Sequence, residues 1–167
     1  MKNVILSLFL APLALLAACA PIRCDPVTGI VTKEGVSYRT GVPGPEWRVA
    51  KVGDNDAALF NPRTLSTIAA NGACGVRGDA PLRVLLNHLL FGFSDRKVVS
   101  EEIVTLDGRE ALKAVMTARL DGIPRRFLVY IVKKDWCVYD LQYQAPESAF
   151  DAGLPAFETF VGGFKTK

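Results

Sequence analysis

The fold of this chain is encoded most clearly in residues 97–143, which read KVVSEEIVTLDGREALKAVMTARLDGIPRRFLVYIVKKDWCVYDLQY. Apolar residues recur there at about every second position, which is the period of a β-strand. Four successive strands are predicted, over 97–106, 111–120, 125–133 and 137–143. They are separated by Asp107-Gly108, Asp121-Gly122 and Lys134-Asp135, and Asp-Gly favours a hairpin because glycine tolerates a positive φ. The segment therefore predicts an antiparallel meander.

The same pattern predicts how two of these strands are buried. Along 111–120, every second side chain from Leu112 to Leu120 is apolar, which places one face of that strand on a core. Residues 127–132 are apolar or aromatic at consecutive positions, so this strand is expected in the middle of the sheet.

Two amphipathic helices are predicted to cover the sheet. The first runs over 81–90, where leucines recur at helical spacing and Gly92 supplies a stop. The second lies within 154–164, and we expect it to start at Pro155 and to close at Gly162-Gly163.

Further strands are predicted before the first helix. Residues 36–40 alternate like a short strand, a Pro- and Gly-rich break follows, and the alternation resumes over 47–52. Residues 57–60 and 64–70 then form a predicted hairpin around Asn61-Pro62, a dipeptide that favours a turn.

The N-terminus has the features of an export signal. Residues 1–3 are a short cationic start, and residues 4–16 are a mostly apolar run that is too short to span a bilayer comfortably. Leu16-Ala17-Ala18-Cys19 resembles a bacterial lipobox, which implies that the Cys19 thiol receives a diacylglyceryl group and that Cys19 becomes the new N-terminus. The alternative is an ordinary signal peptide cut near Ala20, in which Cys19 has no such role.

These features divide the chain into three predicted parts. We expect a signal peptide over residues 1–18, a lipidated tether over 19–34 and a single domain over 35–167. The tether contains proline and glycine and shows no lasting period. Lipoproteins that are retained at an inner membrane often resemble one another in carrying Asp directly after the modified cysteine. This chain has Ala20 at that position. We therefore expect the protein on the outer membrane, facing the periplasm.

Export also decides how the remaining cysteines are interpreted, because an oxidising compartment favours disulfides. Cys74 and Cys137 both lie beside predicted strands and are the preferred pair, and Cys24 with Cys74 is the alternative. No metal site is predicted, because the chain has no CxxC or CxxH spacing and its one histidine is His88.

The order of the predicted elements resembles that of PsbP-like domains. It runs from Gly35-Val36-Ser37-Tyr38 through a Pro/Gly-rich break, Trp47, a hairpin, the first helix and the meander to the C-terminal helix, over about residues 36–164. The resemblance implies an α+β fold, an α/β/α sandwich whose central antiparallel sheet is covered by helices. It also implies a family of accessory proteins that bind membrane assemblies or partner proteins.

The first predicted helix carries apolar residues on its second side, where charge is expected for a helix that packs by one face. Val84, His88 and Phe91 project from this side, and together with Trp47 they are the candidate partner-binding residues. Several alternatives stay open. The helix side could be a second packed layer or scattered surface residues, Trp47 could be a core anchor, and His88 could be structural.

No catalytic motif and no cofactor are predicted. A Ser-His-Asp or Cys-His arrangement would need His88, which lies mid-helix without a nucleophile motif. The sequence contains no glycine-rich phosphate loop. The formal charge of +3 comes from scattered Lys and Arg residues and gives no reason to expect nucleic acid.

We therefore expect a non-catalytic accessory protein of the cell envelope. It would be anchored in the membrane through its lipidated N-terminus and would bind another envelope protein through its domain. The alternative is a periplasm-facing carrier of a small molecule or lipid, with a pocket between the sheet and the helices.

Overall fold

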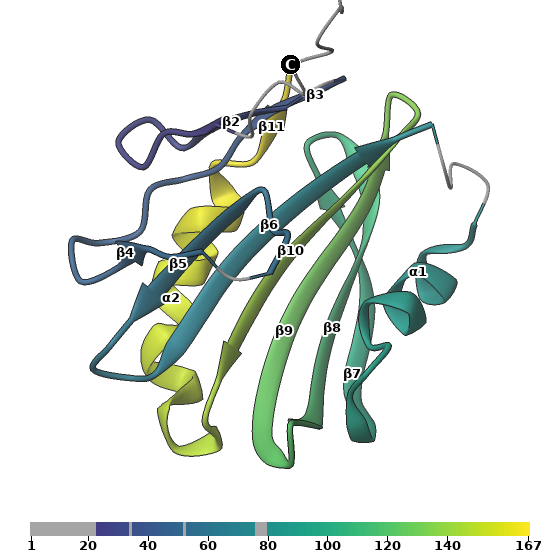
Figure 1. Cartoon of the computed structure of the whole chain (residues 1–167). Coiled ribbons are helices and arrows are strands. Elements are labelled where there is room, and N and C mark those ends of the chain that lie inside the picture. Colours follow the sequence, from purple (N-terminus) through teal and green to yellow (C-terminus); the bar gives the residue numbers. More distant parts are fainter. Residues whose placement is uncertain (1–22, 34, 52, 76–79) are drawn as a thin grey trace, which may run out of the picture.

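The computed structural model describes residues 23–33, 35–51, 53–75 and 80–167. These residues form a seven-stranded sheet, a smaller four-stranded sheet and two α-helices (Figure 1). The predicted α+β class and the central antiparallel sheet are confirmed.

The large sheet is antiparallel throughout, and its strand order is β4-β5-β6-β10-β9-β8-β7. Its strands are β4 (Arg48–Val49), β5 (Ala57–Asn61), β6 (Ser66–Cys74), β7 (Ser94–Leu106), β8 (Arg109–Leu120), β9 (Ile123–Lys134) and β10 (Cys137–Ala145). The last four of these strands are the predicted meander. β9 lies inside the sheet between β8 and β10, as its two apolar faces require. The strand predicted over 47–52 is shorter than expected, because only Arg48 and Val49 pair with β5.

Two of the three hairpin turns in the meander follow the predicted Asp-Gly pairs. Asp107-Gly108 and Asp121-Gly122 have positive φ at both residues, the conformation that a two-residue hairpin requires. The third turn is Asp135-Trp136, with φ of 51° and 63°, rather than the predicted Lys134-Asp135. It comes one residue later because Lys134 still pairs with Cys137 in the ladder.

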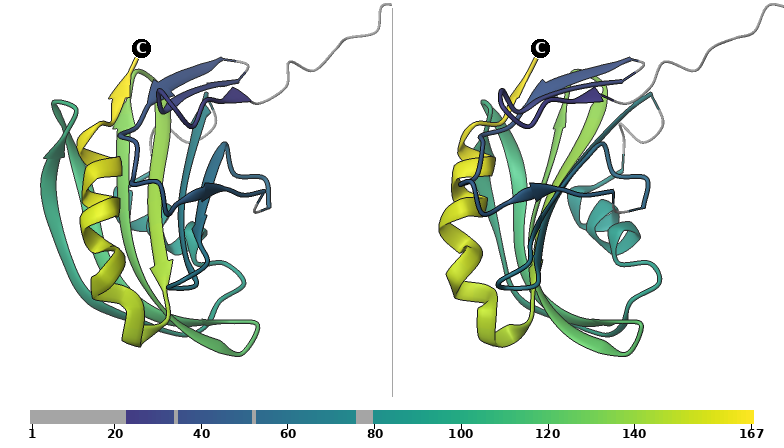
Figure 2. Two further views of the ribbon diagram at one scale, coloured as in Figure 1. Left: turned by 90° about the vertical axis from the view of Figure 1, so that its left-hand side faces the viewer. Right: turned by 60° about the vertical axis from the view of Figure 1, so that its left-hand side comes forward.

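The helices cover opposite faces of the large sheet (Figure 2). α1 (Leu82–Leu89) matches the predicted first helix and buries Leu85 and Leu86 against the apolar face of β8 and β9. α2 (Phe150–Gly162) covers the other face, where Phe157 and Phe160 belong to a larger core with aromatic residues of β9 and β10. The sheet therefore lies between a long helix and a short one, and the short one leaves part of its face uncovered.

The C-terminal helix begins earlier than predicted. A short 3-10 turn, η1 (Glu147–Ala149), leads into α2 at Phe150, so Pro155 lies inside the helix instead of starting it. Tyr143 holds the first turn of α2, because its hydroxyl donates a hydrogen bond to the Phe150 carbonyl oxygen at 2.9 Å. Gly153 faces the Tyr143 side chain so closely that a Cβ at this position would collide with it. These tertiary contacts hold α2 against Tyr143 from its first turn.

Residues 23–33 differ from the predicted tether, because they are part of the fold. β1 (Arg23–Cys24), β2 (Ile30–Lys33), β3 (Val36–Arg39) and β11 (Lys165–Thr166) form the small antiparallel sheet, in the order β1-β2-β3-β11. The β1–β2 turn is stabilised by the Asp25 side chain, which accepts a hydrogen bond from the backbone N–H of Val27 at 2.9 Å. Strands of two to four residues are too short for their period to stand out in the sequence.

Candidate functional site

The outer side of α1 carries three of the four predicted partner-binding residues. Val84 is 40% exposed, Phe91 just after the helix is 89% exposed, and His88 between them is exposed as well. The opposite side of the helix docks on the sheet through Leu85 and Leu86. We name the surface formed by Val84, His88 and Phe91 the α1 face.

The structure separates Trp47 from the α1 face. Its side chain is 8% exposed and belongs to the core on the α2 side of the sheet. The indole packs edge-on against the Tyr143 ring, with 6.4 Å between the ring centroids. Trp47 therefore occupies the position of the core anchor that the sequence left open as an alternative.

A cleft of about 350 Å³ lies between α1 and the uncovered part of the large sheet. We name it the α1 cleft. Its walls combine apolar side chains of α1 and the sheet with polar side chains of the sheet: Asn71, Ala73, Leu85, His88, Leu89, Ile131, Val138 and Asp140. His88 belongs both to this cleft and to the α1 face, so the two surfaces are continuous.

The polar side of the α1 cleft is a hydrogen-bonded group centred on Asp140. Asn71 lies directly opposite on β6, and its Nδ2 donates to Asp140 Oδ1 at 2.9 Å and to Asn55 Oδ1 at 2.8 Å. Gln142 Nε2 donates to the same Asp140 oxygen at 2.7 Å. Burial raises the pKa of the Asp140 carboxyl, and these two hydrogen bonds only partly oppose that rise.

A smaller hollow of about 160 Å³ continues along the same face of β10, beyond Gln142. Its apolar side includes Phe93 and Phe127, and its polar side includes Gln142 and Gln144. Among the described residues, the Gln144 Oε1 atom is buried and has no hydrogen-bond partner. Asp140, Gln142 and Gln144 therefore form a polar strip beside apolar walls, which can hold a group that has an apolar body and hydrogen-bond donors.

This polar strip is not among the site residues predicted from the sequence. Its signal is the alternation of β10, in which Asp140, Gln142 and Gln144 oppose Tyr139, Leu141 and Tyr143. That pattern alone predicts a solvent-facing side. Only the position of α1 turns this side into the wall of a cleft.

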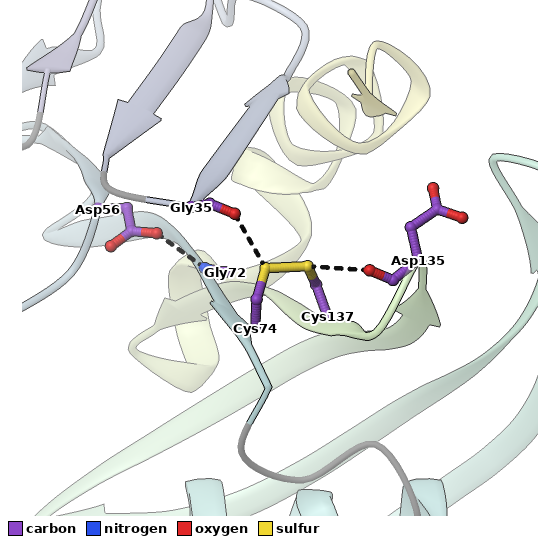
Figure 3. The surroundings of a disulfide bond; sticks show 6 residues. All are labelled: Gly35, Asp56, Gly72, Cys74, Asp135 and Cys137. Atoms are coloured by element: carbon purple, nitrogen blue, oxygen red, sulfur yellow. Dashed lines mark hydrogen bonds between the residues drawn. A yellow bond between two sulfur atoms is a disulfide. The ribbon is translucent and has the colours of Figure 1, made fainter.

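The predicted disulfide between Cys74 and Cys137 is confirmed. The two cysteines are directly opposite each other on β6 and β10, at one end of the sheet (Figure 3). The Cys74 sulfur lies 3.2 Å from the Gly35 carbonyl oxygen, a close contact between the disulfide and the β2–β3 turn.

Cys24 is a half-buried free thiol, and burial raises its pKa. Cys19, the predicted lipidation site, lies outside the described residues.

Within the described residues, no group of three or more His, Cys, Asp and Glu side chains could hold a metal ion. No helix found there is long and apolar enough to cross a membrane.

The fold is similar to solved structures of proteins with very different sequences. LpqN of Mycobacterium tuberculosis, described as involved in cell envelope biogenesis, has a TM-score of 0.59 and 14% identity, over 80% of this chain and 86% of that chain. The cyanobacterial PsbP protein (CyanoP) of Synechocystis has a TM-score of 0.53 and 10% identity, over 95% of this chain and 99% of that chain. The PsbP-like fold is thereby confirmed. No protein-family model matches the chain, and no curated protein matches it in sequence.

Proposed function

We propose that this chain is a lipid-anchored, non-catalytic accessory protein of the bacterial envelope that binds another envelope protein through the α1 face and the α1 cleft. The observation that carries the proposal is Phe91, whose side chain is 89% exposed three residues after His88, which lines the α1 cleft. Isolated apolar residues on a surface are ordinary, but here Val84 and Phe91 each lie within four residues of His88, which lines a cleft.

The energetics favour a partner at this position. Covering a fully exposed Phe side chain contributes about 1.5–3 kcal/mol, and aromatic residues at the centre of an interface often dominate its energy. Val84 and the cleft walls would add apolar area around this anchor. The carboxylate of Asp140 could accept hydrogen bonds from a partner segment that enters the cleft.

The size of the cleft argues for a protein segment rather than a whole lipid. Pockets that enclose drug-sized ligands measure roughly 300–1,000 Å³, and the α1 cleft, at about 350 Å³, is at the low end of this range. It is large enough for one or two side chains of a partner.

The envelope location rests on two supports. Leu16-Ala17-Ala18-Cys19 resembles a lipobox, and two or three acyl chains on Cys19 would hold the protein firmly on a membrane. The fold is similar to that of LpqN, which is described as involved in cell envelope biogenesis. Ala20 after the cysteine favours the outer membrane.

The proposal is tested by affinity recovery from cross-linked native envelopes through a C-terminal tag. We expect a stoichiometric envelope protein with the natural chain and its loss with the double variant Val84→Ser/Phe91→Ser. The matched control is Val49→Ser/Ile123→Ser, because these two side chains are each 56% exposed and lie outside α1. Equal recovery with both double variants would remove the α1 face from the account.

A second candidate function is a small-molecule carrier. The buried Gln144 Oε1 without a partner favours it, because a bound ligand could supply the missing donor. Native mass spectrometry of delipidated protein tests this candidate. A reproducible small ligand that is lost in Gln144→Leu would favour the carrier, whereas ligand-free protein together with a recovered partner would favour the accessory role.

A further inference from the structure

The domain begins very close to the predicted lipid anchor. β1 starts at Arg23, only four residues after Cys19, whereas the sequence alone predicted a tether that extends to residue 34. A fully extended chain spans at most about 3.6 Å per residue, so four residues reach about 14 Å. If Cys19 carries lipid, the part of the domain around Arg23 must lie within about that distance of the membrane surface.

A chain of contacts connects β1 to one end of the large sheet. Arg23 pairs with Thr32 on β2, and the turn that follows β2 places the Gly35 carbonyl oxygen 3.2 Å from the Cys74 sulfur. The disulfide joins Cys74 to Cys137, next to the β9–β10 turn, and the Gly75 N–H donates to the Trp136 carbonyl oxygen at 3.0 Å. We name the β2–β3 turn, the disulfide and the Asp135-Trp136 turn together the disulfide end; Figure 1 shows the small sheet and the β9–β10 hairpin at the same end of the molecule.

Trp136 is the most prominent side chain of the disulfide end. It is 83% exposed although it is a tryptophan, and its φ of 63° lies in the left-handed region that glycine or asparagine usually occupies. Such a conformation costs a non-glycine residue on the order of 1–2 kcal/mol. The exposed indole gains no core packing that would offset this backbone cost. The fold therefore does not explain why a tryptophan occupies this position.

An indole suits the boundary between water and lipid. Its ring is apolar and its N–H needs a polar partner, and for this reason tryptophan is enriched at the headgroup level of membranes. The nearby charge is mixed, because Asp135 precedes Trp136 in the same turn and Lys133 and Lys134 end β9 just before it. Asp107, in the neighbouring β7–β8 turn, is neutralised by Lys134 at 2.7 Å and Lys165 at 3.0 Å.

We propose that the disulfide end lies against the membrane that holds the lipidated Cys19 and that the Trp136 indole inserts among the lipid headgroups. The inference rests on the lipid anchor of the proposed function. It explains why Trp136 is exposed, and it orients the domain. The β8–β9 turn at Asp121-Gly122 then points away from the membrane, and α1 is presented on the flank.

The experiment uses the full chain, exported and processed in a Gram-negative host, purified with its lipid and inserted into phosphatidylethanolamine and phosphatidylglycerol vesicles. Some vesicles contain lipids brominated near the headgroup end of the acyl chain, which quench nearby indoles. We expect bromolipid quenching of the natural protein and its loss in Trp136→Gly, because Trp47 is buried in the core. Glycine suits the positive φ, so this variant keeps the turn. The matched variant Trp47→Phe keeps Trp136 as the sole indole and should keep the quenching.

The outcomes separate this inference from the proposed function. Mass spectrometry of the N-terminal peptide reports the lipid on Cys19 independently of fluorescence. A lipidated protein whose Trp136 is quenched by aqueous acrylamide but not by bromolipid would overturn the orientation and leave the anchor intact. A protein without lipid on Cys19 would overturn the anchor and this inference together.

Discussion

Lys33 Nζ lies 2.6 Å from Asp56 Oδ1, and this ion pair joins the small sheet to the large one. The Asp56 side chain is fully buried, and its second oxygen accepts hydrogen bonds from the Gly72 N–H at 2.8 Å and the Tyr38 hydroxyl at 3.3 Å. One carboxylate thus connects β2, β3 and β6. This connection fixes the small sheet on the large one.

The first prediction concerns this connection. Asp56→Ala leaves the Lys33 ammonium and the Gly72 N–H without their acceptor, so we expect the free energy of unfolding to fall by about 3 kcal/mol. Urea unfolding of the purified protein measures this loss. Lys33→Met keeps the two other hydrogen bonds of Asp56 but leaves its buried carboxylate without a counter-charge, so we expect a comparable loss. A loss below 1 kcal/mol for Asp56→Ala would show that the small sheet is held mainly by its apolar contacts.

The second prediction concerns the disulfide. The Cys74–Cys137 bridge closes a loop with a sequence separation of 63 residues, and the chain-entropy relation gives a stabilisation of about 4 kcal/mol for a loop of that length. We expect the double variant Cys74→Ala/Cys137→Ala to lose up to that amount in urea unfolding. Adding reductant to the natural protein should reproduce the loss, while reductant should leave the variant unchanged. A variant as stable as the natural protein would contradict the expectation.

The third prediction is a loss of stability in acid that depends on Asp107. Partial burial alone would raise the pKa of its carboxyl, but hydrogen bonds from Lys134, Thr166 and Lys165 outweigh burial and hold the pKa well below its usual range. A carboxyl with a lowered folded pKa stabilises the protein above the unfolded pKa of about 3.9, and this stability is lost as the pH falls further. Asp107→Asn should therefore be less stable at pH 7, and the difference should shrink below about pH 4. A difference that stays constant with pH would contradict this assignment.

The fourth prediction has the opposite sign and concerns Asp140. Burial raises the pKa of this carboxyl, so ionising it in the folded protein costs stability at neutral pH. Asp140→Asn keeps the acceptor oxygen for Asn71 and Gln142, and we expect a higher urea midpoint than that of the natural protein at pH 7. The gain should disappear at about pH 3, below the ordinary pKa of aspartate. A lower midpoint at pH 7 would mean that the charged carboxylate has a stabilising partner.

Much of the fold could be predicted because the relevant patterns are long. The alternation of β8 runs along a strand of 12 residues and the leucine spacing of α1 along a helix of 8 residues, and burial enforces both patterns. Of the small sheet, β3 was predicted as the strand over 36–40, but β1 and β11 could not be, since they have two residues each and depend on pairing with distant segments. The start of α2 was misplaced because Pro155 favours a first turn locally, whereas the contact of Gly153 with Tyr143 is tertiary.

Only the part of the candidate site that depends on local spacing could be predicted from the sequence. Val84, His88 and Phe91 follow from helical spacing alone, so the sequence places them on one side of a helix. Trp47 is a large apolar residue just before the short strand β4, and the sequence does not show that the Tyr143 ring covers it. Asp140 belongs to the cleft only because α1, distant in sequence, packs against β8 and β9, next to β10.

The most direct test of the central claim is photo-cross-linking from position 91 in intact cells. Phe91 is replaced by a photoreactive phenylalanine analogue, and a second strain carries the same analogue at Ile123, which is exposed at a different place on the domain. The proposed function predicts one discrete adduct with an envelope protein from position 91 and none from position 123. Identical adducts from both positions, or none from position 91 in a stably expressed protein, would contradict the claim that the α1 face binds a partner.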